Sequence, residues 1–545
     1  MDRALDDKFS RRSFFKVGAG VAGAVGVGTI LEACGGSSAT GSGTGATGAA
    51  NPAAGTAHTA PSAGTPKKGG TLMVGFTGGS SSDTLDGFNV YTSVDAARSS
   101  ALFEQLVQWN NQGQIENRLA EEFTPNSNGT VWTIRLKPGL TFHSGKPVTA
   151  DDLIFTFQHM LNPKAPTLGS AAMVAVNPKG FKKLDSRTVR VQMTMPQTTW
   201  KEQLSVPFFF PVVPVGYDPK KPIGAGPFKL DSFTPGQRSV MSRFDGYFVT
   251  GQPYLDQLVI EDFPTSTSQI NALTGGQINA AGSIPWVEVR ELSGQSQVKI
   301  VNERSGQWNE YPMRTDVAPF NDVRVRQAIK LLIDRPQFVE DVYSGQAIIG
   351  NDVYARFDPD YNSNLPQRAH DPEKAKSLLK AAGADNYSFT LISGPWVPGL
   401  LEGAELIAQQ ATTAGVKVTV KNTPIGQFVA QDYLKAPWAS GYWYDNPYAA
   451  QTILSMTKTA GQNETHWSNA QWNSLWNQLN ATPEGTGPYR DLIHQMQNVE
   501  WDQGGTIIPG FYNAVDAVAS NVQGLAVPDT IGPLGGPRFE RGWIS

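Results

Sequence analysis

A single cysteine, Cys34, limits how this chain can be stabilised. The chain has 545 residues and only this one cysteine, so no disulfide can form within it and the fold depends on its apolar core. One compact core does not normally extend over so many residues, and we therefore expect two or more lobes. The net charge of −4 offers no basic field to a nucleic-acid backbone, so we expect no nucleic-acid partner.

Residues 1–33 have the composition of an export signal rather than of a folded domain. Arg11 and Arg12 precede an uncharged run from Val17 to Leu31 that is mostly Gly, Ala and Val. That run is too short and too weakly apolar to span a bilayer, which predicts a signal peptide. The paired arginines resemble the twin-arginine export signal.

Cys34 follows Leu31-Glu32-Ala33 at the end of the apolar run. The placement resembles a lipobox, in which the thiol receives a lipid, although Glu32 departs from the small or apolar residue usual there. The alternative is a free buried thiol. From Gly35 to Thr65 no residue is charged, so residues 34–68 are predicted to be a lipid-anchored flexible linker. We expect the protein outside the cytoplasm, on the outer face of the bacterial cytoplasmic membrane, in the periplasmic space or at the cell surface.

The most legible part of the folded body runs from Val131 to Leu161. Residues 131–136 alternate as a half-buried strand, and Lys137-Pro138-Gly139 supplies a turn. Thr149 is placed to cap a helix, with Asp152 three residues later.

This segment and three later ones resemble the peptide- and nickel-type extracellular solute-binding proteins of family 5. The four segments occur in the order expected for that family: residues 134–153, residues 223–230 with their Gly-x-Gly-Pro-Phe pattern, residues 319–335, and residues 371–379. The residues themselves agree with helices in the last two. Asn321 is predicted to cap one helix, and Asp371 with Pro372 is predicted to begin the other. Residues 388–392 and 416–420 are predicted strands around a helix at 400–413, which implies a parallel pair.

The resemblance implies an α/β fold of the two-lobed, periplasmic-binding-protein-like type II class, in its large peptide-binding form with an extra subdomain. On this basis residues 69–92, 177–285 and 505–545 are assigned to lobe I, 93–176 to the extra subdomain on its side, and 286–504 to lobe II. The chain would cross between lobes near residues 285 and 505.

The resemblance also implies a function. The chain would be the substrate-binding component of an ABC importer, capturing a peptide or similar small solute and delivering it to a permease and ATPase complex. We expect it to act as a monomer. The same fold could instead bind an oligosaccharide or a metal chelate, or serve as a surface hydrolase, sensor or chaperone.

Catalysis finds little support in the sequence. There is no Gly-x-Ser-x-Gly nucleophile elbow and no phosphate-binding loop, and the six histidines are scattered without metal-ligand spacing. We therefore expect no enzyme activity, no cofactor and no bound metal. His143 is predicted to be a hydrogen-bonded turn residue.

The candidate ligand site is an aromatic loop between residues 438 and 448. It places several large rings and one carboxylate around Gly441 and Pro447, a combination suited to a cleft wall that holds a cation. The resemblance assigns the pairing with a peptide α-amino group to Asp445. The alternative is that Asp445 caps a helix starting near Pro447. The candidate ligand-binding residues are Asp445, Trp443, Tyr444, Asn446, Trp438 and, more weakly, Trp308.

Overall fold

The computed structural model describes residues 64–545 except 78, 80, 82, 91, 111–113, 166, 396, 425–426, 459 and 526–531. The predicted signal peptide with Arg11 and Arg12, the predicted lipidation site Cys34 and most of the predicted linker lie outside the described residues. No helix among those described is long and apolar enough to cross a membrane.

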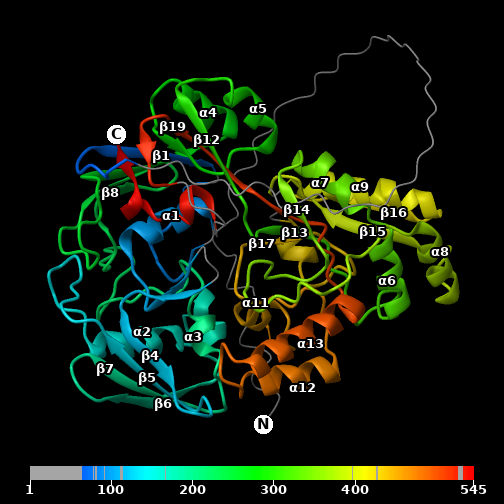
Figure 1. The fold of residues 1–545 in the computed structure, drawn as a ribbon, viewed down its shortest axis with the longest axis horizontal. Helices are drawn as coiled ribbons and strands as arrows, with labels where there is room; N and C mark the ends of the chain where they lie inside the picture. Colours follow the sequence, from blue (N-terminus) through cyan, green and yellow to red (C-terminus); the bar gives the residue numbers. More distant parts are fainter. Residues whose placement is uncertain are drawn as a thin grey trace.

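The first lobe is built on a mixed seven-stranded sheet. In its centre β1 runs parallel to β10 and β11, while the remaining neighbours pair antiparallel. The helix α1 (Ser93–Leu102) packs against β1, β8 and β10, and α4 (Ser266–Thr274) and α5 (Val289–Leu292) lie nearby (Figure 1). The strand order is β12 (Val298–Glu303), β19 (Ala514–Ala519), β11 (Ala280–Ala281), β1 (Thr71–Thr77), β10 (Gln257–Phe263), β9 (Arg238–Arg243) and β8 (Phe228–Thr234).

A second, antiparallel sheet forms the extra subdomain. Its order is β4 (Ala120–Pro125), β5 (Val131–Leu136), β7 (Thr188–Met193) and β6 (Val176–Lys183). The helix α2 (Ala150–Met160) packs on β6 and β7, and α3 (Trp200–Gln203) follows. The predicted strand at 131–136 is confirmed, and the backbone N–H and hydroxyl of Thr149 donate to Asp152 at 2.8 and 2.7 Å, as the predicted cap requires.

The boundaries predicted for the subdomain need correction. Residues 93–102 belong with the main sheet, because α1 packs on it, whereas β6 and β7 belong with the subdomain, because they pair with β5. The subdomain nevertheless shares one continuous apolar core with the first lobe, since Trp132 and Trp200 belong to the same buried cluster as residues of β1 and β10.

The second lobe contains a four-stranded sheet with helices around it. The strand order is β14 (Ala347–Ile349), β18 (Gly510–Tyr512), β13 (Trp308–Glu310) and β17 (Gly441–Trp443). The predicted parallel pair is confirmed as β15 (Ser388–Ser393) and β16 (Lys417–Asn422). The helices are α6 (Val323–Leu331), α7 (Arg335–Tyr343), α8 (Pro372–Ala381), α9 (Leu400–Ala411), α11 (Tyr448–Ser455), α12 (Ala470–Leu479) and α13 (Gly487–Gln503).

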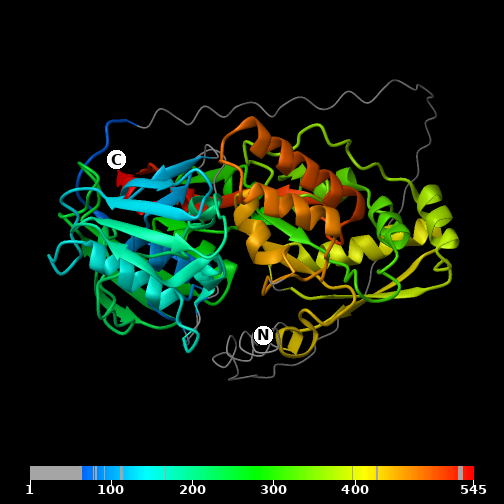
Figure 2. The same cartoon turned by 90° about the horizontal axis from the view of Figure 1, so that it is seen from below.

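The chain passes between the lobes at residues 304–307 and at Asn513. At the first passage, β12 belongs to the first-lobe sheet and β13, directly after it, belongs to the second-lobe sheet. At the second passage, the chain leaves the second-lobe sheet with β18 and returns to the first-lobe sheet with β19. The crossings predicted near 285 and 505 are therefore wrong, because residues 286–303 stay with the first lobe and residues 510–512 still belong to the second. Both views show two bodies side by side joined by these segments (Figures 1 and 2).

Close backbone contact explains the glycine-rich segment before β8. A Cβ on Gly224 or on Gly226 would collide with the backbone of Leu102 at the end of α1, so side chains larger than hydrogen would force α1 away from the sheet. The ring of His143 lies 3.0 Å from the carbonyl oxygen of Gly226, and burial lowers its pKa to about 4. His143 is thus a neutral, hydrogen-bonded residue of the turn, as predicted.

The predicted caps in the second lobe are confirmed in one case and shifted in the other. Asp371 accepts from the backbone N–H of Lys374 at 2.9 Å, and Pro372 is the first residue of α8. The cap of α6 is Asp322 rather than Asn321: its carboxylate accepts from the N–H of Arg324 at 2.8 Å. Asn and Asp are both common helix caps, so the sequence pattern alone does not decide which of these two neighbours caps α6.

A buried ion pair network stabilises the second lobe around Asp352. Arg335 donates to both carboxylate oxygens of Asp352 at 2.8 Å, and Arg368 donates to one at 2.7 Å. The N–H of Ile508, just before β18, donates to the same carboxylate at 3.0 Å. Burial alone would raise the pKa of Asp352, but the two guanidinium groups hold it at about 2.

We predict that Asp352→Asn destabilises the second lobe by about 3 kcal/mol, because two buried guanidinium groups lose their counter-charge. Since the folded pKa lies below the ordinary value of about 4, the carboxylate's contribution is present above pH 4 and is lost as the pH falls toward 2. Urea denaturation followed by tryptophan fluorescence at pH 7 and at pH 3 measures both effects.

Asp151→Asn is the matched control for this substitution. Asp151 pairs with Lys183 at 2.7 Å, but the two side chains are 58% and 43% exposed. The change should cost less than about 1 kcal/mol. Equal losses for the two variants would contradict the assignment of Asp352 as the centre of the network.

Candidate ligand-binding site

The aromatic loop of the sequence forms β17, at the edge of the second-lobe sheet. In the antiparallel register Trp308 lies opposite Trp443, and Glu310 lies opposite Gly441. Residues paired in this way project to the same face of a sheet. One face therefore carries both tryptophans and Glu310, while Asn309 and Tyr442 project to the other.

Two indole groups hold the carboxylate of Glu310 between them. The indole N–H of Trp308 donates to one oxygen at 3.1 Å, and that of Trp443 donates to the other at 3.0 Å. The indole N–H of Trp443 also donates to a carboxylate oxygen of Glu464 at 3.4 Å, and the carboxylates of Glu464 and Glu310 are close to each other. Burial first, and the neighbouring Glu464 second, raise the pKa of Glu310 well above its ordinary value.

Glu310 and Glu464 both line a small cavity in the second lobe. Rings and polar side chains line it together, among them Trp308, Tyr354, Gln451, Ser455, Thr465 and Thr506. Glu310 is buried, whereas Glu464 is half-buried, so Glu464 is the member of the pair that solvent reaches. The arrangement offers negative charge and ring faces, which suit a cationic or polar group.

Asp445 lies beside the chain crossing and is only 3% exposed. A Cβ on Gly306, in the crossing segment, would collide with the carboxylate of Asp445. The side chain thus reaches the junction of the two lobes because residue 306 has no side chain of its own.

The alternative role for Asp445, as the cap of α11, is not what the structure shows. The residue before α11 is Pro447, with no side-chain cap. The N–H of Tyr448 donates to Asp358 at 2.8 Å, and the N–H of Ala449 donates to Glu202 at 2.7 Å. The first N–H groups of the helix are therefore satisfied by other carboxylates.

Tyr444 lies near the first lobe. Burial raises the pKa of its hydroxyl, and the nearby side chain of Ser93, the first residue of α1, partly offsets this. Tyr444 and Tyr442 are each 38% exposed, which is unusual for large rings in this protein. These two residues give the loop an aromatic surface at the junction of the lobes.

The other candidate residues have structural partners. The amide of Asn446 donates to Gln451 at 2.8 Å and so ties the loop to α11. Trp438 is fully buried between Phe320 and Phe389, with its indole N–H donating to the carbonyl oxygen of Tyr311 at 3.1 Å. The prediction that Trp438 lines the cleft is therefore wrong, since its ring completes an apolar core.

Trp308 is also fully buried and stacks against Tyr354 with ring centroids 6.2 Å apart. It is a core residue whose ring also lines the small cavity, and its indole N–H bonds to Glu310. Glu310, Glu464 and Ser93 were not predicted; of these, only Glu310 carried a signal, because it follows Trp308 at the two-residue spacing of one strand face.

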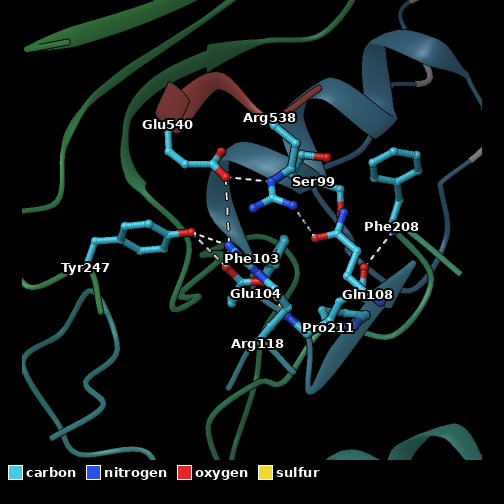
Figure 3. Close-up of a pocket in the computed structure, with 12 residues that line it drawn as sticks. Ser99, Phe103, Glu104, Gln108, Arg118, Phe208, Pro211, Tyr247, Arg538 and Glu540 are labelled. Carbon is cyan, nitrogen blue, oxygen red and sulfur yellow. Dashed lines mark hydrogen bonds and ion pairs between the residues drawn. The ribbon is translucent and has the colours of Figure 1, made fainter. Parts of the chain in front are cut away.

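A further cavity lies in the first lobe, where the C-terminal segment meets the end of α1 (Figure 3). Its charges are paired with one another: Arg118 donates to Glu104 at 2.8 Å and to Tyr247 at 2.7 Å, and Arg538 donates to Glu540 at 2.5 Å. Although burial opposes it, the two arginines hold the pKa of Glu540 below its usual value. This network fixes the C-terminal segment to the first lobe.

Known proteins resemble the whole of this architecture. A dipeptide-binding protein of Escherichia coli (strain K12) is 25% identical over 494 residues, covering 83% of this chain and 90% of the relative. The periplasmic binding protein DppA from Helicobacter pylori, solved with the peptide STSA, superposes with a TM-score of 0.75 at 20% identity and covers 88% of this chain and 98% of its own. The oligopeptide-binding protein AppA from Bacillus subtilis, solved with a nonapeptide, gives 0.74 at 20% identity, covering 88% of this chain and all (100%) of its own.

A family model also matches this chain. The family model described as "Bacterial extracellular solute-binding proteins, family 5 Middle" matches residues 114–465. The match extends over more than half of the chain, from the strands of the subdomain past Asp445 and α11 to Glu464. The chain belongs to the bacterial extracellular solute-binding proteins of family 5.

Proposed function

We propose that this protein captures a peptide, or a similar small solute, outside the cytoplasmic membrane and delivers it to an ABC permease and ATPase. The observation that carries the proposal is the position of Asp445: a buried carboxylate beside the segment where the chain crosses between the lobes. The names of the relatives, a dipeptide-binding protein and two peptide complexes, support a peptide as the solute.

The role proposed for Asp445 is to pair with the α-amino group of the peptide. A charge-assisted hydrogen bond shielded from water is stronger than the same bond at the surface, and Asp445 is placed to supply it. Trp443 and Tyr444 directly precede it in the sequence and add ring surface for the peptide backbone and side chains. This arrangement is suited to binding and releasing a solute rather than to catalysing a reaction.

We propose further that Cys34 carries the lipid that keeps the protein at the membrane. The apolar run before it and the uncharged segment after it support a processed, tethered N-terminus. The tether would let the two-lobed body reach both solute and permease while it stays near the membrane.

We expect Asp445→Asn to weaken peptide binding by about tenfold to a hundredfold, because the amide keeps the shape of the side chain but loses its charge. Isothermal titration calorimetry with the tightest binder from a panel of unblocked dipeptides to nonapeptides measures the loss. The N-acetylated form of that peptide is the control: it should bind weakly to the original protein and no more weakly to the variant. Unchanged affinity of Asp445→Asn for the unblocked peptide would contradict the pairing.

Cys34→Ala should move the protein from the membrane fraction to the soluble fraction, since one residue supplies the only anchor proposed. Fractionation of cells expressing either form, with and without detergent, tests this. If the original protein is equally soluble without detergent, the anchor is wrong, whereas the solute-binding role is unaffected.

A further inference from the structure

The extra subdomain of the first lobe binds directly to the second lobe through the segment around α3. The backbone N–H of Thr198 donates to the carbonyl oxygen of Asn480 at 2.8 Å, and its hydroxyl donates to that of Thr482 at 2.7 Å. The hydroxyl of Thr199 donates to the side chain of Asn480 at 2.7 Å. These contacts surround one buried carboxylate.

That carboxylate is Glu202, on α3, which is 4% exposed. One oxygen accepts from the backbone N–H of Ala449 at 2.7 Å, and the other accepts from the hydroxyl of Tyr489 at 2.7 Å. Both partners belong to the second lobe. Glu202 is thus a first-lobe residue with both oxygens bonded across the junction.

One of these bonds reaches the start of the helix α11. Ala449 is the second residue of α11, and α11 begins directly after the loop that carries Asp445. The first N–H groups of a helix have no partner within the helix and need an outside acceptor. Because Glu202 supplies one, the opposite lobe fixes the helix that positions the proposed ligand loop.

The contact lies away from the chain crossing. In Figure 1 β12 and β19, which lead into the crossing, lie toward the top of the molecule, whereas α3 meets α11, α12 and α13 toward the bottom. A rotation of one lobe about the crossing segments would therefore separate Glu202 from α11.

We propose that Glu202 is a positioning residue of the solute site: it latches α11, and with it the loop bearing Asp445, when the two lobes close on a solute. This inference rests on the proposed function and adds to it a contribution from the lobe opposite the loop. The latch forms only in the closed arrangement, so part of the free energy of binding depends on it.

Closure also changes the surroundings of Glu202. With the lobes in contact, as they are in this structure, burial raises its pKa well above the ordinary value, and the carboxylates of Asp358 and Glu484, both in the second lobe, raise it further. The remaining charges nearby are Asp360, paired with Arg490 at 2.9 Å, and Lys201, which favours the ionised form of Glu484. A raised pKa means that closure takes up a proton, so the latch is strongest below the ordinary pKa of about 4 and weakens as the pH rises through the raised value.

The test compares Glu202→Ala with Glu500→Ala, while Glu202→Gln, which keeps the form of the neutral acid, isolates the effect of the proton. Glu500 is also a buried carboxylate that accepts from a tyrosine hydroxyl and an N–H group, Tyr448 at 2.5 Å and Trp472 at 2.7 Å, but all three residues belong to the second lobe. Glu202→Ala, which removes both acceptor oxygens, should weaken binding of the tightest peptide of the panel by about tenfold and leave the melting temperature of the ligand-free protein nearly unchanged. Glu500→Ala should lower the melting temperature and change the affinity less.

Calorimetry near pH 7 in buffers of different ionisation heat measures the proton uptake on binding. The original protein should take up protons when the peptide binds, and Glu202→Gln should lose that uptake. Unchanged affinity in Glu202→Ala together with unchanged uptake in Glu202→Gln would overturn the latch. So would an equal loss of affinity in Glu202→Ala and Glu500→Ala, because the effect would then be one of general stability.

A second measurement separates the latch from the identity of the solute. Leu184 and Tyr387, 42% and 47% exposed, lie on the subdomain and on the second lobe. Spin labels on Leu184→Cys and Tyr387→Cys, in the full chain with Cys34→Ala, report the distance between lobes without any ligand. The closed population should fall from pH 5 to pH 8 in this background and not in Glu202→Gln. If no peptide binds but this pH dependence appears, the proposed function fails and the latch stands; identical distances in both backgrounds would overturn it.

Discussion

The two lobes depend on one pair of antiparallel segments that run through both of them. On the first-lobe side β12 pairs with β19 along six residues, from Val298↔Ala519 to Glu303↔Ala514. The pairing continues through the crossing, where the N–H of Tyr512 donates to the carbonyl oxygen of Gln307 at 3.0 Å and Asn513 donates to Asn302 at 2.8 Å. It enters the second lobe at Trp308↔Phe511. The junction is therefore a short ribbon held by backbone bonds rather than two independent linkers.

This ribbon explains where the candidate site lies. Its first segment contains Gly306, against which Asp445 packs, and continues into the strand that holds Glu310 opposite β17. The residues around the site are therefore placed by the same few bonds that join the lobes. A ribbon of this kind can bend and twist without losing its pairing, which lets one lobe rotate against the other while the loop keeps its neighbours.

Local features of the chain were predictable where a single short-range interaction decides the structure. The Thr149 and Asp152 cap, the Asp371-Pro372 helix start and the parallel pair β15–β16 each follow from neighbouring residues or from one repeated pattern. The family resemblance gave the two-lobed fold. The crossings were misplaced because the pairing of β12 with β19 joins segments more than two hundred residues apart, which no local pattern records.

The candidate site was predictable only in part, for a related reason. An aromatic ring in a turn-rich loop can be exposed or complete a core: Trp438 is fully buried, whereas Tyr444, six residues later, is 38% exposed. Glu310 and Glu202 acquire their surroundings from distant parts of the chain: Glu310 from β17 and Glu464, and Glu202 from α11 and α13. Sequence spacing identifies the loop, but the partners of its residues come from tertiary packing.

The position of β19 has a consequence for how the protein is made. The first-lobe sheet has β1 near its centre, yet β19 and the Arg538–Glu540 clasp come from the far end of the chain. During synthesis the first lobe therefore stays incomplete until the last part of the chain has left the ribosome, whereas β13 through β18 form a continuous stretch that can assemble earlier. The second lobe can then be complete before β19, which emerges after it, pairs with β12 to complete the first-lobe sheet and the junction.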